Sequence, residues 1–171
     1  MMTPNLTPRE RLLYSLLSIA SRSDLLRGAR TVRERAFWSL EKMDAFRLRR
    51  CRETLVHAGS HVPYYRALFR DLGFDPHSFA SFDDLRHLPV LTRGILVERF
   101  ADLRSEIHPP SAVTTVRTGG TTGSPVTVLQ DRANATERLL VTHRLFALMG
   151  RTRGSPTLLI AGNPIDSRAW G

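Results

Sequence analysis

An eight-residue stretch rich in glycine and hydroxyl side chains is the part of this sequence best suited to chemistry. It reads Thr118-Gly119-Gly120-Thr121-Thr122-Gly123-Ser124-Pro125. Glycine permits a positive φ and has no Cβ, so main-chain N–H groups can turn toward a bound oxyanion and approach it closely. Threonine and serine hydroxyls add donors for phosphate oxygens. The composition predicts a phosphate-binding loop with these candidate ligands: Thr118, Gly119, Gly120, Thr121, Thr122, Gly123 and Ser124.

Two common nucleotide-binding patterns do not describe this loop. A Walker A sequence needs a lysine directly after its last glycine, whereas Gly123 is followed by Ser124 and Pro125. The glycines also lack the G-x-G-x-x-G spacing, and we expect no helix directly behind them. A glycine-rich hairpin that binds no ligand is the alternative interpretation of so short a motif.

Segments with strand and helix patterns flank the loop. Val113 to Arg117 and Val126 to Gln130 read as strands. Asp131 can cap a helix that runs to Met149 and ends at Gly150. We expect the buried side of that helix to hold Ala135, Leu139, Thr142, Phe146 and Met149.

A continuous apolar run from Thr157 to Ala161 predicts one more strand, buried on both faces. The order strand, helix, strand then predicts an α/β core with a right-handed crossover. We expect this core to begin in residues 106–171, after a mainly helical region over residues 1–105.

The first hundred residues contain the start and stop signals of several short helices. We predict helices with these signals: a capping box at Thr7 with Pro8, a pattern from Val32 to His57 stopped by Gly59, a segment from Pro63 to Gly73, a capping box at Ser81, and a cap at Thr92 for Arg93 to Phe100. The first helix should bury Leu12, Leu13, Leu16, Leu17 and Ala20. Cys51 lies on the apolar stripe of the second helix, which predicts a buried and unreactive thiol.

Composition limits the class of protein. Hydrophobic residues make up 42% of the 171, which is typical of a globular chain. The net charge is +9, but the arginines alternate with acidic residues, which favours a solvated helical face over a nucleic-acid surface. A single cysteine excludes an internal disulfide and is consistent with the cytoplasm. The sequence has neither a signal-peptide pattern nor the roughly 18 apolar residues of a membrane span.

Several further motifs stand in a recognisable order before the loop. They are Val62-Pro63-Tyr64-Tyr65-Arg66, Gly73, Asp75-Pro76, Phe82-Asp83-Asp84-Leu85 and Leu88-Pro89-Val90-Leu91-Thr92-Arg93. This succession resembles the N-terminal part of phenylacetate–CoA ligases and their CapK-type relatives, over about residues 30–162. The loop resembles the phosphate loop of acyl-adenylate-forming enzymes at six of its eight positions. Gly119 and Ser124 depart from that loop, and Arg93 stands where the group commonly has lysine.

The resemblance implies the start of an ATP-dependent ligase that joins a small carboxylic acid to AMP. It also implies Mg²⁺ as a cofactor and CoA as a candidate acceptor of the acyl group. The family's adenine-binding segments, magnesium-associated acidic residue and C-terminal lysine all lie further along its chain, and Lys42 does not match that lysine. We therefore expect these 171 residues to be a fragment that is inactive alone.

Other functions have weaker support in the sequence. A non-catalytic module that uses its arginine-rich helices to bind a partner or a polyanion is the main alternative. His57 and His61 are four residues apart, but Gly59 and Ser60 should break the helix between them, so we expect no metal site. The absence of a G-x-S-x-G sequence argues against a hydrolase.

Overall fold

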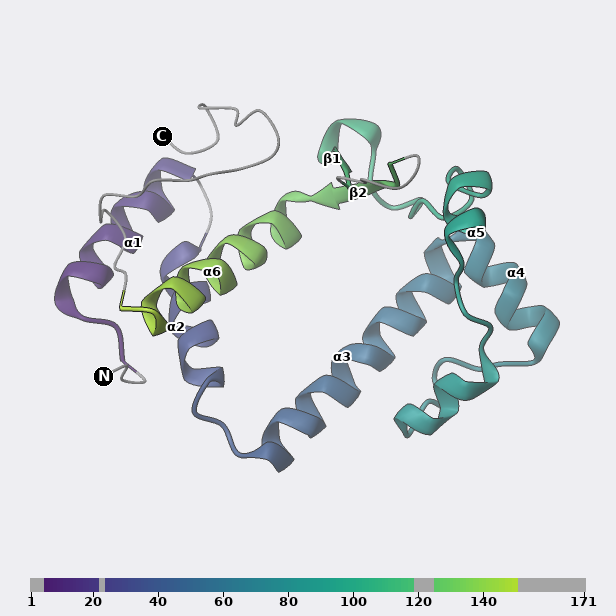
Figure 1. Ribbon diagram of the computed structural model, residues 1–171, viewed down its shortest axis with the longest axis horizontal. Helices are drawn as coiled ribbons and strands as arrows, with labels where there is room; N and C mark the ends of the chain where they lie inside the picture. The colour runs from purple at the N-terminus through teal and green to yellow at the C-terminus, as the bar shows by residue number, and fades with distance from the viewer. Residues whose placement is uncertain (1–4, 22–23, 119–124, 151–171) are drawn as a thin grey trace.

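The computed structural model describes residues 5–21, 24–118 and 125–150 (Figure 1). Its elements in chain order are α1 (Pro8–Ser21), α2 (Leu25–Arg35), α3 (Leu40–His61), α4 (Pro63–Leu72), η1 (Phe82–His87), α5 (Arg93–Glu98), η2 (Pro110–Ala112), β1 (Val113–Arg117), β2 (Thr127–Asp131) and α6 (Arg132–Leu148). Helices therefore precede a strand, strand, helix unit, and the predicted α/β class is confirmed.

The helices α1, α2 and α6 pack together around a small hydrophobic core. Its buried members are Leu6, Tyr14, Leu25, Ala29, Val32 and Leu140. Gly28 lets α2 approach α6 closely, because a Cβ at this position would lie 2.5 Å from Cδ1 of Leu140. The last described helix is thus held against the second one, more than a hundred residues earlier in the chain.

A second packed region surrounds the junction of α3 and α4. Ala58, Val62, Phe69 and Phe79 are buried there. The guanidinium of Arg52 donates from Nε to the carbonyl oxygen of Phe79 at 2.6 Å, which ties the chain before η1 to α3. The long helix α3 crosses from the α1–α2–α6 region to this second one (Figure 1).

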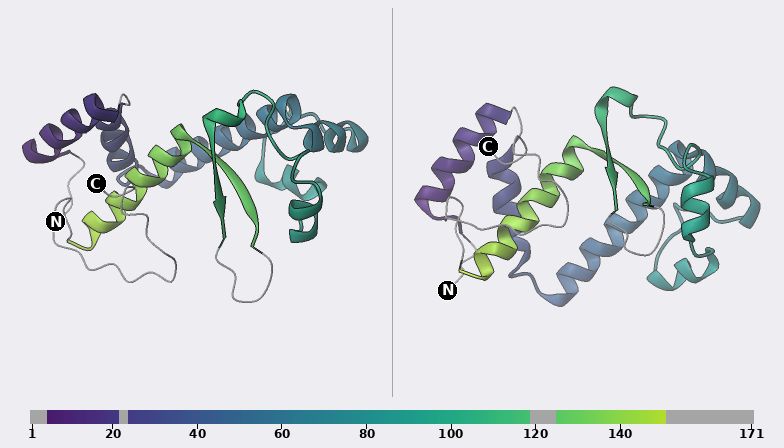
Figure 2. Two further views of the ribbon diagram at one scale, coloured as in Figure 1. Left: turned by 90° about the horizontal axis from the view of Figure 1, so that it is seen from above. Right: turned by 45° about the horizontal axis from the view of Figure 1, so that its top comes forward.

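The strands β1 and β2 form an antiparallel ladder between these two regions. Val113 pairs with Asp131 at one end, and Arg117 pairs with Thr127 at the other. Figure 2 shows the two strands running side by side between α6 and the α4–α5 end of the molecule. α6 follows β2 without a loop, because Oδ1 of Asp131 accepts a hydrogen bond from the amide of Asn134 and caps the helix, as predicted.

The predicted caps of the early helices are confirmed. Thr7 and Glu10 form a capping box in which the Thr7 amide donates to Oε2 of Glu10 at 2.8 Å. A second capping box joins Ser81 to Asp84, and Thr92 accepts from the amide of Ile95. Gly73 ends α4 in the left-handed conformation, with φ 63°.

The single helix predicted from Val32 to His57 is wrong. α2 ends at Arg35, and α3 starts at Leu40, where Oγ of Ser39 accepts from the amide of Lys42 at 3.2 Å. Gly59 does not stop α3, which continues to His61. A side chain at Gly59 would press on Phe69, so the position serves the close contact between α3 and α4.

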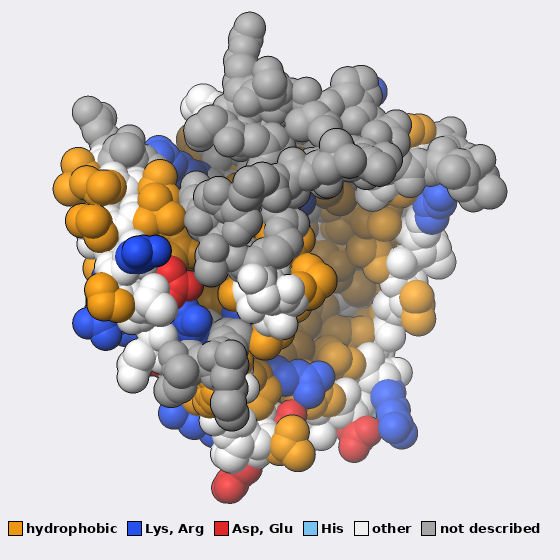
Figure 3. Space-filling view, turned by 60° about the vertical axis from the view of Figure 1, so that its left-hand side comes forward, with side chains coloured by type: hydrophobic (Ala, Val, Ile, Leu, Met, Phe, Trp, Pro, Cys, Tyr) orange, Lys and Arg blue, Asp and Glu red, His pale blue; other side chains and the backbone are white. Residues whose placement is uncertain are grey.

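The predicted buried faces of two helices also need correction. On α1, Leu12 and Leu16 are 64% and 58% exposed, whereas Tyr14 is buried in the core. On α6, the buried residue is Leu140, and Met149, directly after the helix, is 66% exposed. Both helices carry apolar residues on several sides, so packing against α2 decides which side is covered. Hydrophobic side chains accordingly appear on the surface and along the visible wall of a hollow (Figure 3).

Three other predictions have different outcomes. Cys51 is only partly buried, although this burial does raise the pKa of its thiol and so disfavours the reactive thiolate. The strand predicted at residues 157–161 lies outside the described residues. The boundary at residue 105 stays a prediction. No helix in the described ranges has the length and apolar character needed to cross a membrane.

The contact between α2 and α6 gives a test of the core. Leu140→Ala should lower the free energy of unfolding by about 2–5 kcal/mol, because it leaves a cavity against Gly28 and Ala29. Leu145→Ala is the matched control, since Leu145 lies on the same helix and is 48% exposed. It should change stability by about 0.5 kcal/mol or less. Equal losses for the two variants in urea unfolding would contradict this packing.

Candidate functional site

The predicted phosphate loop is carried at one end of the β1–β2 ladder. The Thr118 amide donates to the carbonyl oxygen of Val126 at 2.9 Å, and the Val126 amide donates to Oγ1 of Thr118 at 3.0 Å. Thr118 therefore fastens the two ends of the loop together, and its amide and hydroxyl are directed at Val126. The other predicted ligands, residues 119–124, lie outside the described residues.

A cavity of about 390 Å³ lies beside the same ladder. It is bounded by the end of α3, by α4, by the segment from Leu91 to His108 and by β2. Most of its wall is apolar and consists of Val62, Leu91, Leu96, Phe100, Leu103, Val113, Val128 and Leu129. The volume and the lining are typical of a small-molecule site, which is mostly hydrophobic with a few polar groups.

Four of the polar groups of this cavity form two close pairs. Oγ of Ser105 lies 3.0 Å from Nε2 of His57, within hydrogen-bonding distance. Nε2 of His108 lies 3.9 Å from Oδ2 of Asp131. Asp131 thus has two roles, since its other carboxylate oxygen caps α6.

The surroundings of the cavity shift the pKa of two of its side chains. Burial lowers the pKa of His57, and the nearby His61 and His108 lower it further. Burial also raises the pKa of Tyr65, with a smaller contribution from Tyr64. At neutral pH, His57 is therefore an uncharged imidazole that can accept or donate a hydrogen bond.

The wall that carries Ser105 is fixed to the junction of α3 and α4. The Glu106 amide donates to the carbonyl oxygen of His61 at 2.8 Å, and the Tyr64 amide donates to that of Asp102 at 3.0 Å. Nη2 of Arg66 lies 2.6 Å from Oε2 of Glu106. These bonds hold this part of the cavity wall against the junction of α3 and α4.

No motif of the sequence indicates this cavity. His57 and Ser105 are 48 residues apart and belong to no spacing motif. The expectation of a helix break between His57 and His61 was wrong, because α3 continues and brings their rings to 5.1 Å. No group of three potential metal ligands comes together within the described part of the chain.

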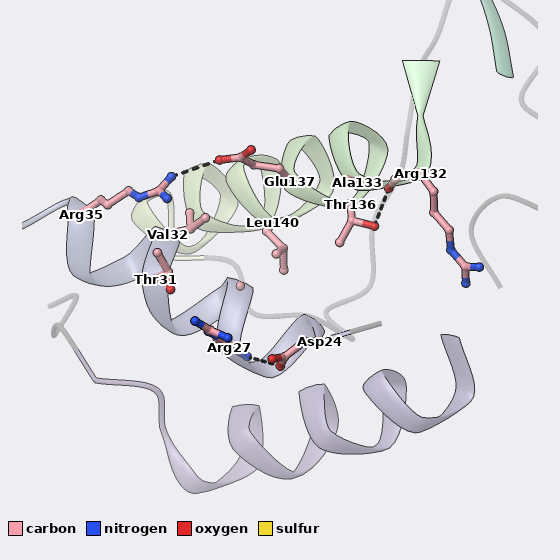
Figure 4. Close-up of a pocket in the computed structure, with 11 residues that line it drawn as sticks. Asp24, Arg27, Thr31, Val32, Arg35, Arg132, Ala133, Thr136, Glu137 and Leu140 are labelled. Atoms are coloured by element: carbon pink, nitrogen blue, oxygen red, sulfur yellow. Dashed lines mark hydrogen bonds and ion pairs between the residues drawn. The ribbon is translucent and has the colours of Figure 1, made fainter. Parts of the chain in front are cut away.

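A larger cavity, of about 730 Å³, lies between α2 and the first half of α6 (Figure 4). Three of its charged side chains, Arg35, Glu137 and Asp24, bond to other groups of the protein. Arg35 bonds Glu137 across the cavity at 3.0 Å, and Asp24 caps α2 through the amide of Arg27. This arrangement favours a groove between packed helices over a polar binding site.

Comparison with known proteins gives one relevant similarity. The chain is 31% identical over 90 residues to phenylacetate-coenzyme A ligase from Escherichia coli (strain K12). The aligned region covers 53% of this chain and 21% of the ligase. No protein-family model matches the chain. The similarity indicates a distant relation to an acid–CoA ligase, in agreement with the ordered motifs of the sequence.

The lowered pKa of His57 predicts a pH dependence of stability. A histidine whose pKa is lower in the folded state than in the unfolded state binds fewer protons when folded, so stability falls as the pH drops through and below its ordinary value of 6.5. The free energy of unfolding should therefore decrease between about pH 7.5 and 5.5. His57→Gln should flatten this slope, and the exposed His77→Gln should not. Urea titrations across this range would contradict the assignment if the slope is unchanged in His57→Gln.

Proposed function

We propose that this chain is part of an ATP-dependent ligase that activates a carboxylic acid as its acyl-adenylate, and that residues 118–124 bind the phosphates of ATP. The observation that carries the proposal is the similarity to phenylacetate-coenzyme A ligase. The composition of the loop supports it, since three glycines and four hydroxyl side chains lie within its seven residues.

The local structure around the loop is consistent with this role. The ladder from Val113 to Asp131 is a rigid support, and Thr118 closes it by bonding to Val126. Thr118 would then be a positioning residue at the base of the loop, rather than a main phosphate ligand. The amides and hydroxyls of residues 119–124 would supply the phosphate contacts.

The proposed reaction makes three demands on the protein. A carboxylate oxygen of the acid bonds to the α-phosphorus of ATP, and the bond from that phosphorus to pyrophosphate breaks. The site must hold the phosphates, neutralise their growing charge and align the acid. Mg²⁺ would supply part of the neutralisation. Within the described residues no acidic cluster fits this ion, so we assign it no ligand. CoA is the proposed acceptor of the acyl group, as in the name of the related ligase.

A polyanion-binding module is less well supported by the structure. Arg49 and Arg50 on α3 both bond to Glu53, and Arg47 pairs with Asp44. Since these arginines already have acidic partners on the same helix, their charge is partly offset where a polyanion would bind. The surface therefore fits the solvated helical face expected from the alternating charges.

The phosphate loop can be tested by substitution of its glycines. The variant Gly120→Val combined with Gly123→Val is made in the full-length ligase of which this chain is proposed to be part. It should abolish acid-dependent exchange between pyrophosphate and ATP, because the added side chains block the approach of phosphate to the loop amides. ATP binding by calorimetry should weaken at least about tenfold, as expected when several hydrogen bonds to charged oxygens are lost.

Thr114→Val is a suitable control, because Thr114 is exposed on β1 and valine favours strands. It should leave both measurements unchanged. If the double glycine variant keeps normal exchange and ATP affinity, the loop has no part in the reaction.

A further inference from the structure

In the part of the chain that the structure describes, the helix α1 has an exposed apolar face. Leu12, Leu16 and Ile19 are 64%, 58% and 77% exposed. They follow one another at intervals of four and three residues, which places them in one row along the helix. Figure 3, in which the α1 side of the molecule comes forward, shows hydrophobic side chains on this surface together with basic ones. A contiguous apolar row of this kind is typical of an interaction surface, whereas single exposed leucines are not.

The opposite face of α1 is fixed to the rest of the protein. Tyr14 is buried in the core that α1 shares with α2 and α6. Oγ of Ser18 accepts a hydrogen bond from the amide of Leu26 at 3.1 Å, and Nη1 of Arg33 lies 2.8 Å from Oε2 of Glu10. Because these contacts hold the inner face, α1 cannot turn its apolar row into the core without breaking them.

The charged side chains beside the apolar row are basic. Arg9 and Arg11 are exposed, and the turn of the helix places them on either side of the row. Glu10 is the one acidic residue of α1, and it is bound on the inner side. Within residues 8–19, the outer face thus carries apolar and basic side chains without an acidic one. Seven arginines against three acidic residues over residues 1–35 make the surrounding charge positive as well.

The size and the charge of this face suit an anionic lipid surface better than a second protein. A specific protein interface uses about 20–30 residues on each side and is anchored by aromatic residues, whereas this row consists of three aliphatic side chains. A helix at a membrane surface needs less area, because its apolar side chains insert among the acyl chains while its basic side chains contact anionic headgroups. α1 also precedes residue 30, where the resemblance to the ligases begins.

We propose that the outer face of α1 binds the surface of a membrane that contains anionic lipids. Leu12, Leu16 and Ile19 insert at the boundary of the acyl chains, and the guanidinium groups of Arg9 and Arg11 bind the headgroup oxygens. The helix lies in the plane of the membrane surface, which requires no spanning segment. This proposal does not depend on the ligase function proposed above.

Binding to lipid vesicles tests the proposal in the full-length protein that contains this chain. The protein should sediment with vesicles of phosphatidylcholine that contain about 30% phosphatidylserine, and it should bind vesicles of phosphatidylcholine alone at least about tenfold more weakly. Binding to the anionic vesicles should weaken as salt rises from about 0.1 to 0.5 M, because salt screens the headgroup charges. Failure to bind the anionic vesicles overturns the proposal.

Leu12→Gln combined with Leu16→Gln tests the apolar row. Both positions are exposed and glutamine favours helices, so the fold should be kept, which circular dichroism checks. Binding to the anionic vesicles should fall at least about tenfold. Leu40→Gln combined with Leu72→Gln is the matched control, since these leucines are 84% and 48% exposed on α3 and α4. It should leave binding unchanged, and equal effects of the two double variants overturn the assignment to α1.

A charge variant and a measurement of mass complete the test. Arg9→Gln should weaken binding to the anionic vesicles roughly fivefold and leave binding to phosphatidylcholine unchanged. If Leu12→Gln with Leu16→Gln turns a dimer into a monomer in analytical ultracentrifugation and leaves vesicle binding intact, the face joins two copies of the chain and the proposal is wrong. Vesicle binding that is lost in this variant while acid-dependent pyrophosphate exchange is kept supports a membrane role of α1 that is separate from the ligase reaction.

Discussion

The pairing of β1 with β2 is the constraint on which both candidate sites depend. Its register sets Arg117 against Thr127, so that the next residues, Thr118 and Val126, meet and close the base of the loop. The same register places Asp131 against Val113 at the other end, beside the cavity. A shift of one residue would turn every side chain of β2 to the opposite face and would remove Leu129 and Asp131 from the cavity wall. One register therefore sets both the meeting of Thr118 with Val126 and the β2 wall of the cavity.

An isolated two-stranded ladder is only marginally stable in water, so this one needs support from the helices. α6 provides it on one side, because it continues β2 directly and packs through Leu140 against Gly28 of α2. The bonds from Glu106 to His61 and from Tyr64 to Asp102 fix the approach to β1 on the other side. The early helices thus act on the candidate site indirectly, by holding the hairpin from both ends.

Local signals in the sequence predicted most of the elements, and tertiary packing explains the errors. Caps at Thr7, Ser81, Thr92 and Asp131 depend on residues within one turn, so the sequence shows them directly. The buried face of α6 could not be read in this way, because apolar residues surround the helix and only its contact with Gly28 selects Leu140. The cavity was missed for a similar reason. His57, Ser105 and Asp131 come from three distant segments, and no short motif links them.

Under the proposed function, the strand β2 has two roles. It begins directly after Val126 at the base of the phosphate loop, and Thr127, Leu129 and Asp131 line the cavity of about 390 Å³, so one strand sets the distance from the base of the loop to the cavity. Alignment of reactants on a rigid support accounts for a large part of the rate of a two-substrate reaction.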